Sequence, residues 1–287
     1  MEERKRSSAA EILVALGKAL CYLALFLGCQ LLVSLAYSVA AALYVGLNQG
    51  FSDPMSLARE VTRLVYACTG QISLFSDLAV LLILVLFFLL RKKNPFREAG
   101  AIPASLSMTA AAAGLAPVLY LVVTFVLGLL PERWLESYME ASSALSETGL
   151  IMTLATVVAA PIAEEVIFRG LILSRLKRAM PGWLAVVLSA LAFGLCHGQA
   201  VWIAYAFTLG LLFGLMAHRS GSILPSMVTH FVFNGIGQLM TCLDESPAAV
   251  PLLFALALAG IVICIFARRG LADLFQFQSI REENDNV

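Results

Sequence analysis

The segment Pro161–Arg169 reads PIAEEVIFR and lies inside an apolar run that extends from about residue 150 to residue 173. It holds two adjacent carboxylates, Glu164 and Glu165, and the guanidinium of Arg169. A charge at membrane depth costs at least about 2.5–3.5 kcal/mol on insertion scales, so such residues usually face one another or a water-filled cavity. The segment therefore predicts a buried polar site within a membrane-spanning helix.

The composition of the whole chain agrees with a membrane protein. Of 287 residues, 60% are hydrophobic and only 13% are charged, which is far from the balance of soluble domains. The formal net charge is zero, so bulk charge gives no reason to expect nucleic-acid binding. The six cysteines are scattered through apolar runs without the spacing of a metal site, and we interpret them as small buried hydrophobic residues.

Apolar runs long enough to be membrane crossings divide the chain into about eight helices. A crossing needs roughly 20 residues. The first run is too long for the apolar core of a cleaved signal peptide, so we expect it to be a retained helix. The runs fall at about 19–47, 72–90, 106–130, 150–178, 183–197, 201–217, 222–240 and 249–267.

Basic residues predict the orientation of these helices. With eight crossings, 15 of the 19 Lys and Arg residues fall on one face together with both termini. Positively charged loops are typical of the cytoplasmic side. We therefore expect an all-α polytopic membrane protein with cytoplasmic N- and C-termini. The chain is interpreted as a single domain, 1–287, with a motif core at 150–240 and polar tails at 1–11 and 270–287.

Three of the predicted helices carry polar residues to one depth in the membrane. At 1.5 Å per residue, Glu164 and His197 each lie roughly 21 Å from the basic end of their helices. His230 and Asn234 lie roughly 17 and 23 Å from the basic end of the seventh helix. A single histidine or asparagine would more often be a structural residue, but four such side chains at matched depth favour a functional site.

Spacing predicts which of these side chains share a helical face. His230 and Asn234 are four residues apart and lie on one face. Glu165 and Arg169 have the same spacing and can form an ion pair, while Glu164 points about 100° away. The natural division places Glu164 toward the cavity and uses Glu165 with Arg169 as a structural pair. The reverse assignment of the two glutamates stays open at this point.

Two neighbouring residues complete the expected site. Phe193 precedes His197 by four residues and could pack beside its imidazole. Pro161 lacks a backbone donor and predicts a kink that would open the helix to water. Asp77 is expected near the outer end of the second helix and is not assigned to the site.

The polar residues form three motifs that resemble those of the CPBP intramembrane protease family. Glu164-Glu165-Val-Ile-Phe-Arg169 resembles its EExxxR motif, and Phe193-Gly-Leu-Cys-His197 resembles FxxxH. His230-Phe-Val-Phe-Asn234 resembles HxxxN, and the three occur in the same order with similar gaps. The family includes the type II CAAX prenyl endopeptidases and Abi-type membrane proteins.

The resemblance implies peptide hydrolysis at a site that opens from the cytoplasmic leaflet. Glu164 with His197 would hold and activate a water, and His230 with Asn234 would donate to the developing oxyanion. Glu165 and Arg169 would support this set. The family is also described as metalloproteases, and Glu164, His197 and His230 could bind zinc. A mechanism without a cofactor uses the same residues, and both readings stay open.

The expected partners are a peptide or lipidated-peptide substrate and the lipid bilayer, with no nucleic acid. The expected location is the cell membrane of a bacterium, as a multi-pass protein. The alternative is a non-enzymatic protein of the same fold, either a bacteriocin immunity protein or a proton-coupled transporter. An acid, a base and a cation at mid-membrane also suit a proton-coupled carrier, although no internal repeat is visible.

Overall fold

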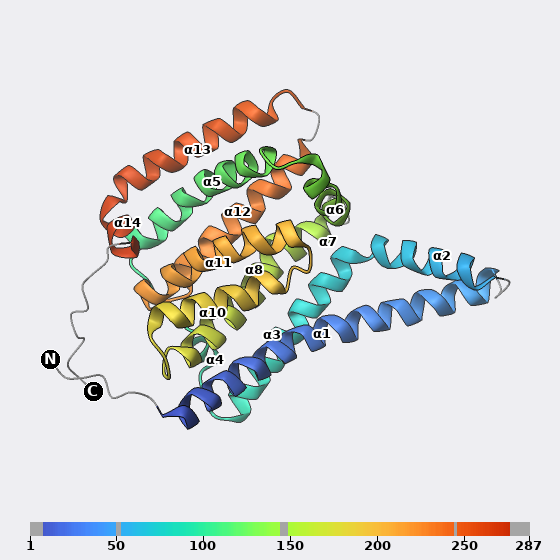
Figure 1. The fold of residues 1–287 in the computed structure, drawn as a ribbon, viewed down its shortest axis with the longest axis horizontal. Helices are drawn as coiled ribbons and strands as arrows, with labels where there is room; N and C mark the ends of the chain where they lie inside the picture. Colours follow the sequence, from blue (N-terminus) through green and yellow to red (C-terminus); the bar gives the residue numbers. More distant parts are fainter. Residues whose placement is uncertain (1–7, 50–52, 144–148, 244–245, 276–287) are drawn as a thin grey trace.

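The computed structural model describes residues 8–49, 53–143, 149–243 and 246–275, and within these ranges it holds helices and turns but no strand. The predicted all-α class is confirmed for this part of the chain, whose arrangement is drawn in Figure 1. With η marking π-helical stretches, the elements are α1 (Ala9–Gln49), α2 (Pro54–Ala67), α3 (Thr69–Leu90), α4 (Pro95–Glu98), α5 (Leu106–Gly128), α6 (Glu132–Ser143), α7 (Leu150–Thr153), η1 (Leu154–Ala159), α8 (Ala160–Glu164), η2 (Glu165–Leu173), α9 (Ser174–Leu176), α10 (Gly182–Leu195), α11 (Ala200–Ser220), α12 (Leu224–Cys242), α13 (Ala249–Phe266) and α14 (Arg268–Phe275).

Within the described residues, 6 helices are long and apolar enough to cross a membrane, counting the continuous segment Leu150–Leu176 as one. We call this segment the fourth helix. The chain is thus a multi-pass membrane protein, but the predicted count of eight crossings is not confirmed. α10 has 14 residues, which reach only about 21 Å. α12 is long enough, but it carries a series of polar side chains.

The first helix differs most from its predicted boundaries. Expected at 19–47, α1 has 41 residues, a length of about 61 Å at 1.5 Å per residue. The hydrocarbon core of a bilayer is only about 30 Å thick. The C-terminal part of α1 continues past the rest of the bundle, with α2 folded back along it (Figure 1). These two parts form a helical hairpin, which we call the arm.

Polar side chains fix where several helices begin. The side-chain oxygens of Asp53, Asn94, Ser105 and Gln199 each accept hydrogen bonds from backbone N–H groups in the first turn of α2, α4, α5 and α11. These N–H groups have no partner within their own helix, so a capping side chain stabilises the helix start. The same backbone bonds, from Ser56 above all, hold the pKa of Asp53 below its ordinary value.

The fourth helix lies within the bundle and carries the motif residues. α1 and α10 both pack on its η2 part, and α3 packs on its η1 and α8 parts. On the other side of the bundle, α5 packs between α12 and α13, and α11 packs on α10 (Figure 1). Segments distant in sequence therefore surround the two glutamates.

Small residues let two helix pairs approach closely. On α11, a Cβ added at Gly210 would lie 3.2 Å from the Ala190 Cα, and one at Gly214 would lie 3.0 Å from Val186 Cγ1. The spacing of these glycines predicts such a packing face, and α10 occupies it. Between α5 and α13, Gly114 and Gly260 face each other in the same way.

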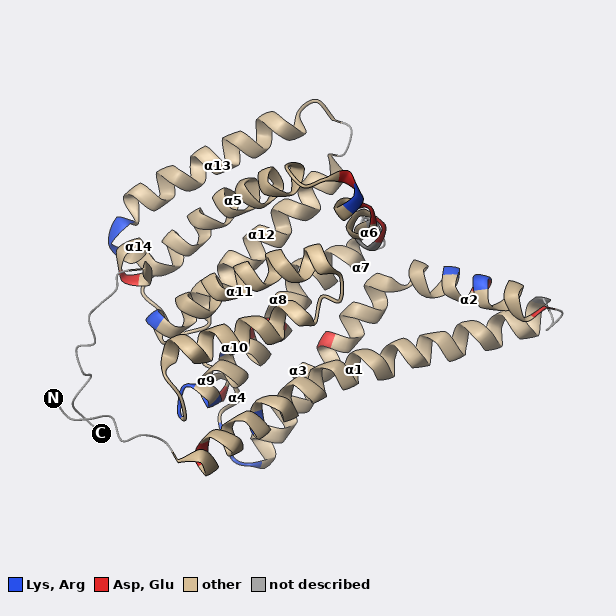
Figure 2. Cartoon of the chain, in the orientation of Figure 1, with Lys and Arg blue, Asp and Glu red and all other residues tan. Residues whose placement is uncertain are grey.

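Charged residues are concentrated at the helix ends. Figure 2 shows Lys and Arg at one end of the bundle, where α3 and α11 end and where α14 begins. We call this the basic end; it includes Arg91, Arg175, Arg219 and Arg268. The other end, where α5 and α10 finish and α6 lies, we call the opposite end. Lys or Arg also occur on α2 and α6, away from this end (Figure 2), and the orientation with both termini in the cytoplasm stays a prediction.

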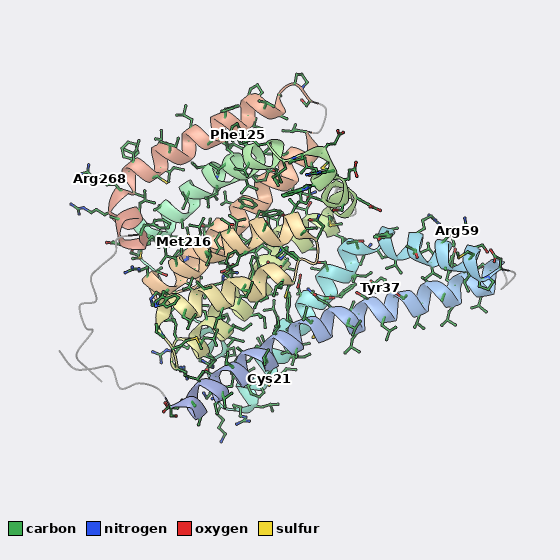
Figure 3. The ribbon with its side chains drawn as sticks, in the orientation of Figure 1. Cys21, Tyr37, Arg59, Phe125, Met216 and Arg268 are labelled. Carbon is green, nitrogen blue, oxygen red and sulfur yellow. The ribbon has the colours of Figure 1, made fainter. Side chains whose placement is uncertain are left out.

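The outer surface of the bundle is apolar. Met216 is fully buried between helices, whereas Phe125 is 66% exposed and points outward (Figure 3). Leu86, Leu258 and Ile265 are exposed in the same way. A soluble protein rarely shows so much contiguous apolar surface, and hydrocarbon is the solvent that this surface suits.

The predicted polar tail begins with a packed helix. α14 (Arg268–Phe275) lies on α5 and α11, with Leu274 fully buried. A Cβ at Gly270 would collide with the backbone of Ser107, so this contact requires glycine. Residues 1–7 and 276–287, on which both predicted termini fall, lie outside the described residues.

Candidate active site

The fourth helix is helical throughout the motif. η1 (Leu154–Ala159) precedes Pro161 and η2 (Glu165–Leu173) follows the first glutamate. Proline cannot donate to the carbonyl four residues earlier and its ring collides with it, and a wider π turn accommodates that defect without a break. Two π-helical stretches therefore flank the α8 turn that holds Pro161, and the kink stays a prediction. Such stretches occur frequently at functional sites.

The two adjacent glutamates occupy different environments. The Glu164 side chain is 18% exposed and lines a cavity, whereas the Glu165 side chain is 0% exposed. The cavity-facing carboxylate is therefore Glu164, and the buried one is Glu165. This is the first of the two assignments that the spacing allowed.

Glu165 is the centre of a buried network. One oxygen of its carboxylate accepts a hydrogen bond from Arg169 at 2.9 Å and lies 3.1 Å from His230 Nδ1. The other oxygen accepts a hydrogen bond from the Ser226 hydroxyl at 2.7 Å. The predicted Glu165–Arg169 ion pair is thus present, and it also reaches α12. A buried charge needs such partners to be tolerated.

Aromatic rings enclose the guanidinium of this pair. The Arg169 Cζ lies 4.3 Å from the centre of the Phe193 ring and 5.2 Å from that of Phe213. Arg169 also donates to the backbone carbonyl of Gly210 at 3.3 Å. A cation over ring faces is stabilised electrostatically. The network therefore joins the fourth helix to α10, α11 and α12.

His197 lies just past the end of α10 and faces the same cavity. Its Nδ1 is 3.0 Å from the carbonyl oxygen of Phe193, and its ring packs edge-on against the Phe193 ring at 4.9 Å. A carbonyl oxygen can only accept a hydrogen bond. Nδ1 therefore carries the hydrogen, and Nε2 is left as an acceptor. The expected packing of Phe193 beside the imidazole is present.

His230 and Asn234 approach the cavity from α12. His230 Nε2 lies 3.5 Å from a Glu164 oxygen while its Nδ1 meets Glu165, so this imidazole bridges the two glutamates. The Asn234 amide donates one hydrogen to the Thr156 carbonyl at 2.9 Å. Its second N–H can still bind another acceptor. Both α12 residues line the cavity, as their four-residue spacing predicts.

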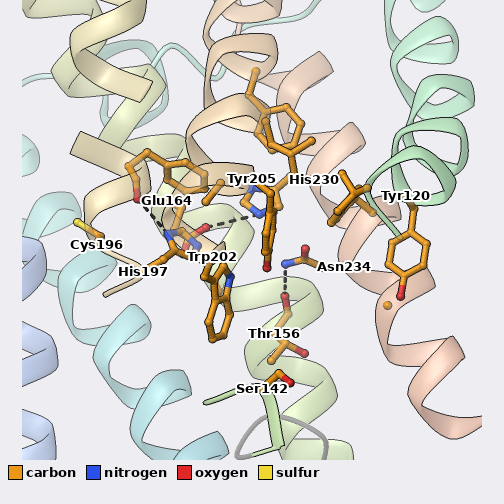
Figure 4. Close-up of a pocket in the computed structure, with 18 of the residues that line it drawn as sticks. Tyr120, Ser142, Thr156, Glu164, Cys196, His197, Trp202, Tyr205, His230 and Asn234 are labelled. Carbon is orange, nitrogen blue, oxygen red and sulfur yellow. Dashed lines mark hydrogen bonds and ion pairs between the residues drawn. The ribbon is translucent and has the colours of Figure 1, made fainter. Parts of the chain in front are cut away.

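A cavity of about 560 Å³ brings the side chains from different helices together. Glu164, His197, His230 and Asn234 all line it, and Figure 4 shows them around one space. This volume lies within the usual range of small-ligand sites. The matched depths calculated from helix rise therefore correspond to one real layer.

The cavity extends toward the opposite end, not the basic end. On the fourth helix and α11, the described lining residues nearest the basic end are Phe168 and Phe213, which are 0% and 1% exposed. On the other side the lining continues to Leu127 and to Thr241, in the last turns of α5 and α12. If basic loops mark the cytoplasm, the expected opening from the cytoplasmic leaflet is not the one seen.

Residues 146–236 match the family model described as "Type II CAAX prenyl endopeptidase Rce1-like". This match supports membership of the CPBP family for residues 146–236. All three motifs, from Glu164 to Asn234, fall within the matched segment.

Similarity to an individual protein covers a comparable share of the chain. A protein of Escherichia coli named "Uncharacterized 24.3 kDa protein" is 31% identical over 96 residues, which are 31% of this chain and 44% of that protein. The chain thus matches less than half of the length of this relative. No solved structure matches the chain.

Zinc in the Rce1-like domain would require Glu164, His197 and His230 to converge on one point. In the described ranges, no three His, Cys, Asp or Glu side chains are arranged so that they could hold a metal ion. The side chains as placed do not fit the metal site considered from sequence.

Sequence reasoning missed several residues of the Rce1-like site. Asp77 on α3 is 2% exposed, and its carboxyl accepts a hydrogen bond from Ser73, which lines the cavity. It is therefore a neighbour of the site, contrary to the expectation that left it out. Ser226 and Thr156 also escaped notice, because a single hydroxyl in an apolar run carries little signal. Ser226 precedes His230 by one helical turn, which could have revealed it.

Proposed function

We propose that this protein is an intramembrane endopeptidase that hydrolyses a peptide bond of a membrane-associated or lipidated peptide. The single observation that carries the proposal is the shared cavity of Glu164, His197, His230 and Asn234 beside a sealed Glu165–Arg169 pair. The family match gives the class of reaction. The residue roles below follow from the positions of these side chains.

Glu164 acts as the general base. Its carboxylate takes a proton from a water molecule, and the water oxygen then bonds to the carbonyl carbon of the substrate. His197 offers Nε2 to the second hydrogen of that water, since Nδ1 is held by the Phe193 carbonyl. Two acceptors on one water would orient its lone pair toward the carbonyl carbon.

Asn234 and His230 stabilise the charge that develops on the carbonyl oxygen. The second amide hydrogen of Asn234 is available, because the first binds the Thr156 carbonyl and fixes the side chain. His230 in its protonated form presents Nε2–H, with Nδ1–H directed at Glu165. Loss of one such donor typically costs about 2.7–4 kcal/mol in the transition state.

Collapse of the tetrahedral intermediate breaks the carbon–nitrogen bond. The proton taken up by Glu164 passes to the leaving amine, so the carboxylate is regenerated and the atoms balance. Glu165 and Arg169 do not touch the substrate in this scheme. They are positioning residues that hold His230 and the helix contacts in place.

The proposal is tested with purified protein in detergent and peptides embedded in micelles. A farnesylated peptide ending in a CAAX sequence and an unprenylated membrane peptide library serve as substrates. Glu164→Gln should lower the rate by about 10²–10⁴-fold, the usual contribution of general acid–base catalysis. Glu60→Gln, which changes a carboxylate on α2 far from the cavity, should cleave at the wild-type rate.

Equal cleavage by wild type and Glu164→Gln would overturn the proposed mechanism. The role of metal is tested separately, by metal analysis of the pure protein and by treatment with a chelator. The proposed mechanism predicts no loss of activity with the chelator. A loss that added zinc restores would replace the metal-free scheme with a zinc-dependent one.

A further inference from the structure

The cavity continues past the catalytic layer into an aromatic chamber at the opposite end. Tyr120, Tyr138, Trp202 and Tyr205 line this part, and Figure 4 shows three of these side chains grouped near His197 and Asn234. Ring contacts connect them: Tyr138 packs edge-on against both Trp202 and Tyr205 at 6.2 Å. None of these residues belongs to the three motifs.

The aromatic chamber begins at a catalytic side chain. The Trp202 ring lies 5.7 Å from the His197 imidazole. A peptide whose cut bond lies between Glu164 and His197 would therefore place a neighbouring side chain against Trp202. Tyr and Trp rings bind apolar groups because they bury a large apolar surface. Their O–H and N–H groups can still form hydrogen bonds where water is present.

Helix α6 covers the chamber. Its Tyr138 and Ser142 face the cavity, and its Ser137 hydroxyl accepts a hydrogen bond from the Gln199 amide at 2.8 Å. Gln199 also caps the first turn of α11. These contacts, together with the Tyr138 ring contacts to Trp202 and Tyr205, attach α6 to the first turns of α11.

Among the described residues, the lining of this cavity does not continue to the basic end, where a separate hollow of about 380 Å³ is lined by α1, Arg175 and Arg178. Below Phe168 the fourth helix continues with Leu171, Ile172 and Leu173, all at most 2% exposed. The Glu165–Arg169 pair fills the space beside them. A peptide would have to break the buried ion pair to pass through that end.

We propose that the substrate reaches Glu164 from the opposite end, beneath α6, and that Trp202, Tyr138 and Tyr205 form the subsite for a bulky apolar side chain next to the cut bond. The inference rests on the proposed peptidase function. Because basic loops mark the cytoplasmic side, it assigns cleavage to peptide segments presented at the outer leaflet. The recognised substrate is thus an extended peptide with a large apolar residue at this subsite.

Access is tested without reference to activity. Cys196 lines the cavity beside His197 and reports on its entrance. Intact cells and inverted membrane vesicles are treated with a membrane-impermeant maleimide, and labelled Cys196 is quantified by mass spectrometry. Cys196 should be labelled from the side of the membrane on which α6 lies. A separate Arg59→Cys variant, with its thiol on the arm at the same end of the protein, shows which side that is. Labelling only from the face of the basic end would overturn the entry route, whether or not the protein proves to be a peptidase.

The role of α6 is tested with a reversible cross-link. Ser137→Cys and Gln199→Cys place two thiols where a hydrogen bond now joins α6 to the start of α11. Oxidation of the double variant should lower cleavage at least about tenfold, and reduction should restore it. Each single variant, treated identically, controls for loss of the Gln199 cap. Full activity in the cross-linked protein would show that peptides do not pass beneath α6.

The subsite is tested by a ratio of substrates. Trp202→Ala should lower kcat/KM for a peptide with Phe or Leu at the subsite by about 10–200-fold relative to the same peptide with Ala. The ratio cancels any general damage to His197, because both peptides need the same catalytic residues. If kcat/KM fell equally for both peptides, Trp202 would only hold His197 in position and would not form the subsite. A Glu164→Gln protein that still cleaves would instead refute the proposed function.

Discussion

The two ends of the helix bundle differ in how they treat polar groups. Toward the basic end, the Glu165–Arg169 pair is fully enclosed, and it contacts Ser226, His230 and the Gly210 carbonyl. Toward the opposite end, Glu164 and Asn234 line a cavity of about 560 Å³. The polar groups around Glu165 and Arg169 thus hold helices together. Those of the adjacent Glu164 and Asn234 layer stay accessible to a substrate.

This comparison explains how neighbouring residues serve different purposes. Glu164 and Glu165 share a backbone but point about 100° apart. A buried carboxylate with three partners resists change, while a carboxylate in a cavity can exchange protons with water. Changes near the basic end should therefore reduce stability most, and changes in the cavity should reduce activity most.

The largest effect is expected from Arg169→Ala. It leaves the carboxylate of Glu165 buried without its ion-pair partner, which typically costs about 3–5 kcal/mol. Thermal unfolding in detergent should show a large fall in the midpoint relative to wild type. Arg59→Ala on the exposed arm, where loss of a surface arginine should cost little, is the control. Similar small shifts for both variants would contradict the assigned role of the sealed pair.

Ser226→Ala should have an intermediate effect. Its hydroxyl donates to the ionised Glu165 at 2.7 Å, and a hydrogen bond to a charged group contributes about 1.5–3 kcal/mol. The free energy of unfolding should fall by that amount. Ser38→Ala, which removes a half-buried hydroxyl bonded only within its own helix, is the matched control. An equal change in both serine variants would remove Ser226 from the network.

Glu98 gives a smaller effect with a defined pH dependence. Lys93 first, and then Arg175, hold the pKa of the Glu98 carboxyl below its ordinary value of 4.5. The stabilisation is therefore fully present above pH 4.5 and is lost as the pH falls through the lower folded-state pKa. A partly exposed pair contributes about 0.2–1 kcal/mol.

Unfolding of wild type and Glu98→Gln across pH 7 to 3 tests this. The wild-type protein should be more stable at neutral pH, and the difference should shrink toward zero at the acid end. A difference that does not vary with pH would mean that Glu98 acts through packing and not through its charge.

The smallest effect on stability is expected from Glu164→Gln. The side chain faces the cavity, and its partner His230 keeps the closer contact to Glu165 when the charge of Glu164 is lost, so the free energy of unfolding should change by less than about 0.5 kcal/mol. The same variant should lose cleavage activity. Thermal unfolding measured beside the cleavage assay checks both. A large loss of stability in Glu164→Gln would contradict the division between a layer that stabilises the fold and a layer that serves catalysis.

Much of this arrangement could be predicted from the sequence. A helix advances 1.5 Å per residue, so the distance of Glu164, His197, His230 and Asn234 from their basic helix ends follows from counting. The four-residue spacing of Glu165 and Arg169 gives their pairing in the same way. The depth of the polar layer and the ion pair therefore follow from the sequence itself.

Contacts between helices decided the rest. Which glutamate faces the cavity depends on the rotation of the fourth helix, which two π-helical stretches and the packing of α1, α3 and α10 set. The approach of Asp77 and the direction of the cavity depend on the shape left between side chains of separate helices. Sequence spacing fixes depth along one helix axis, but only tertiary packing fixes the rotation about that axis and the space beside it.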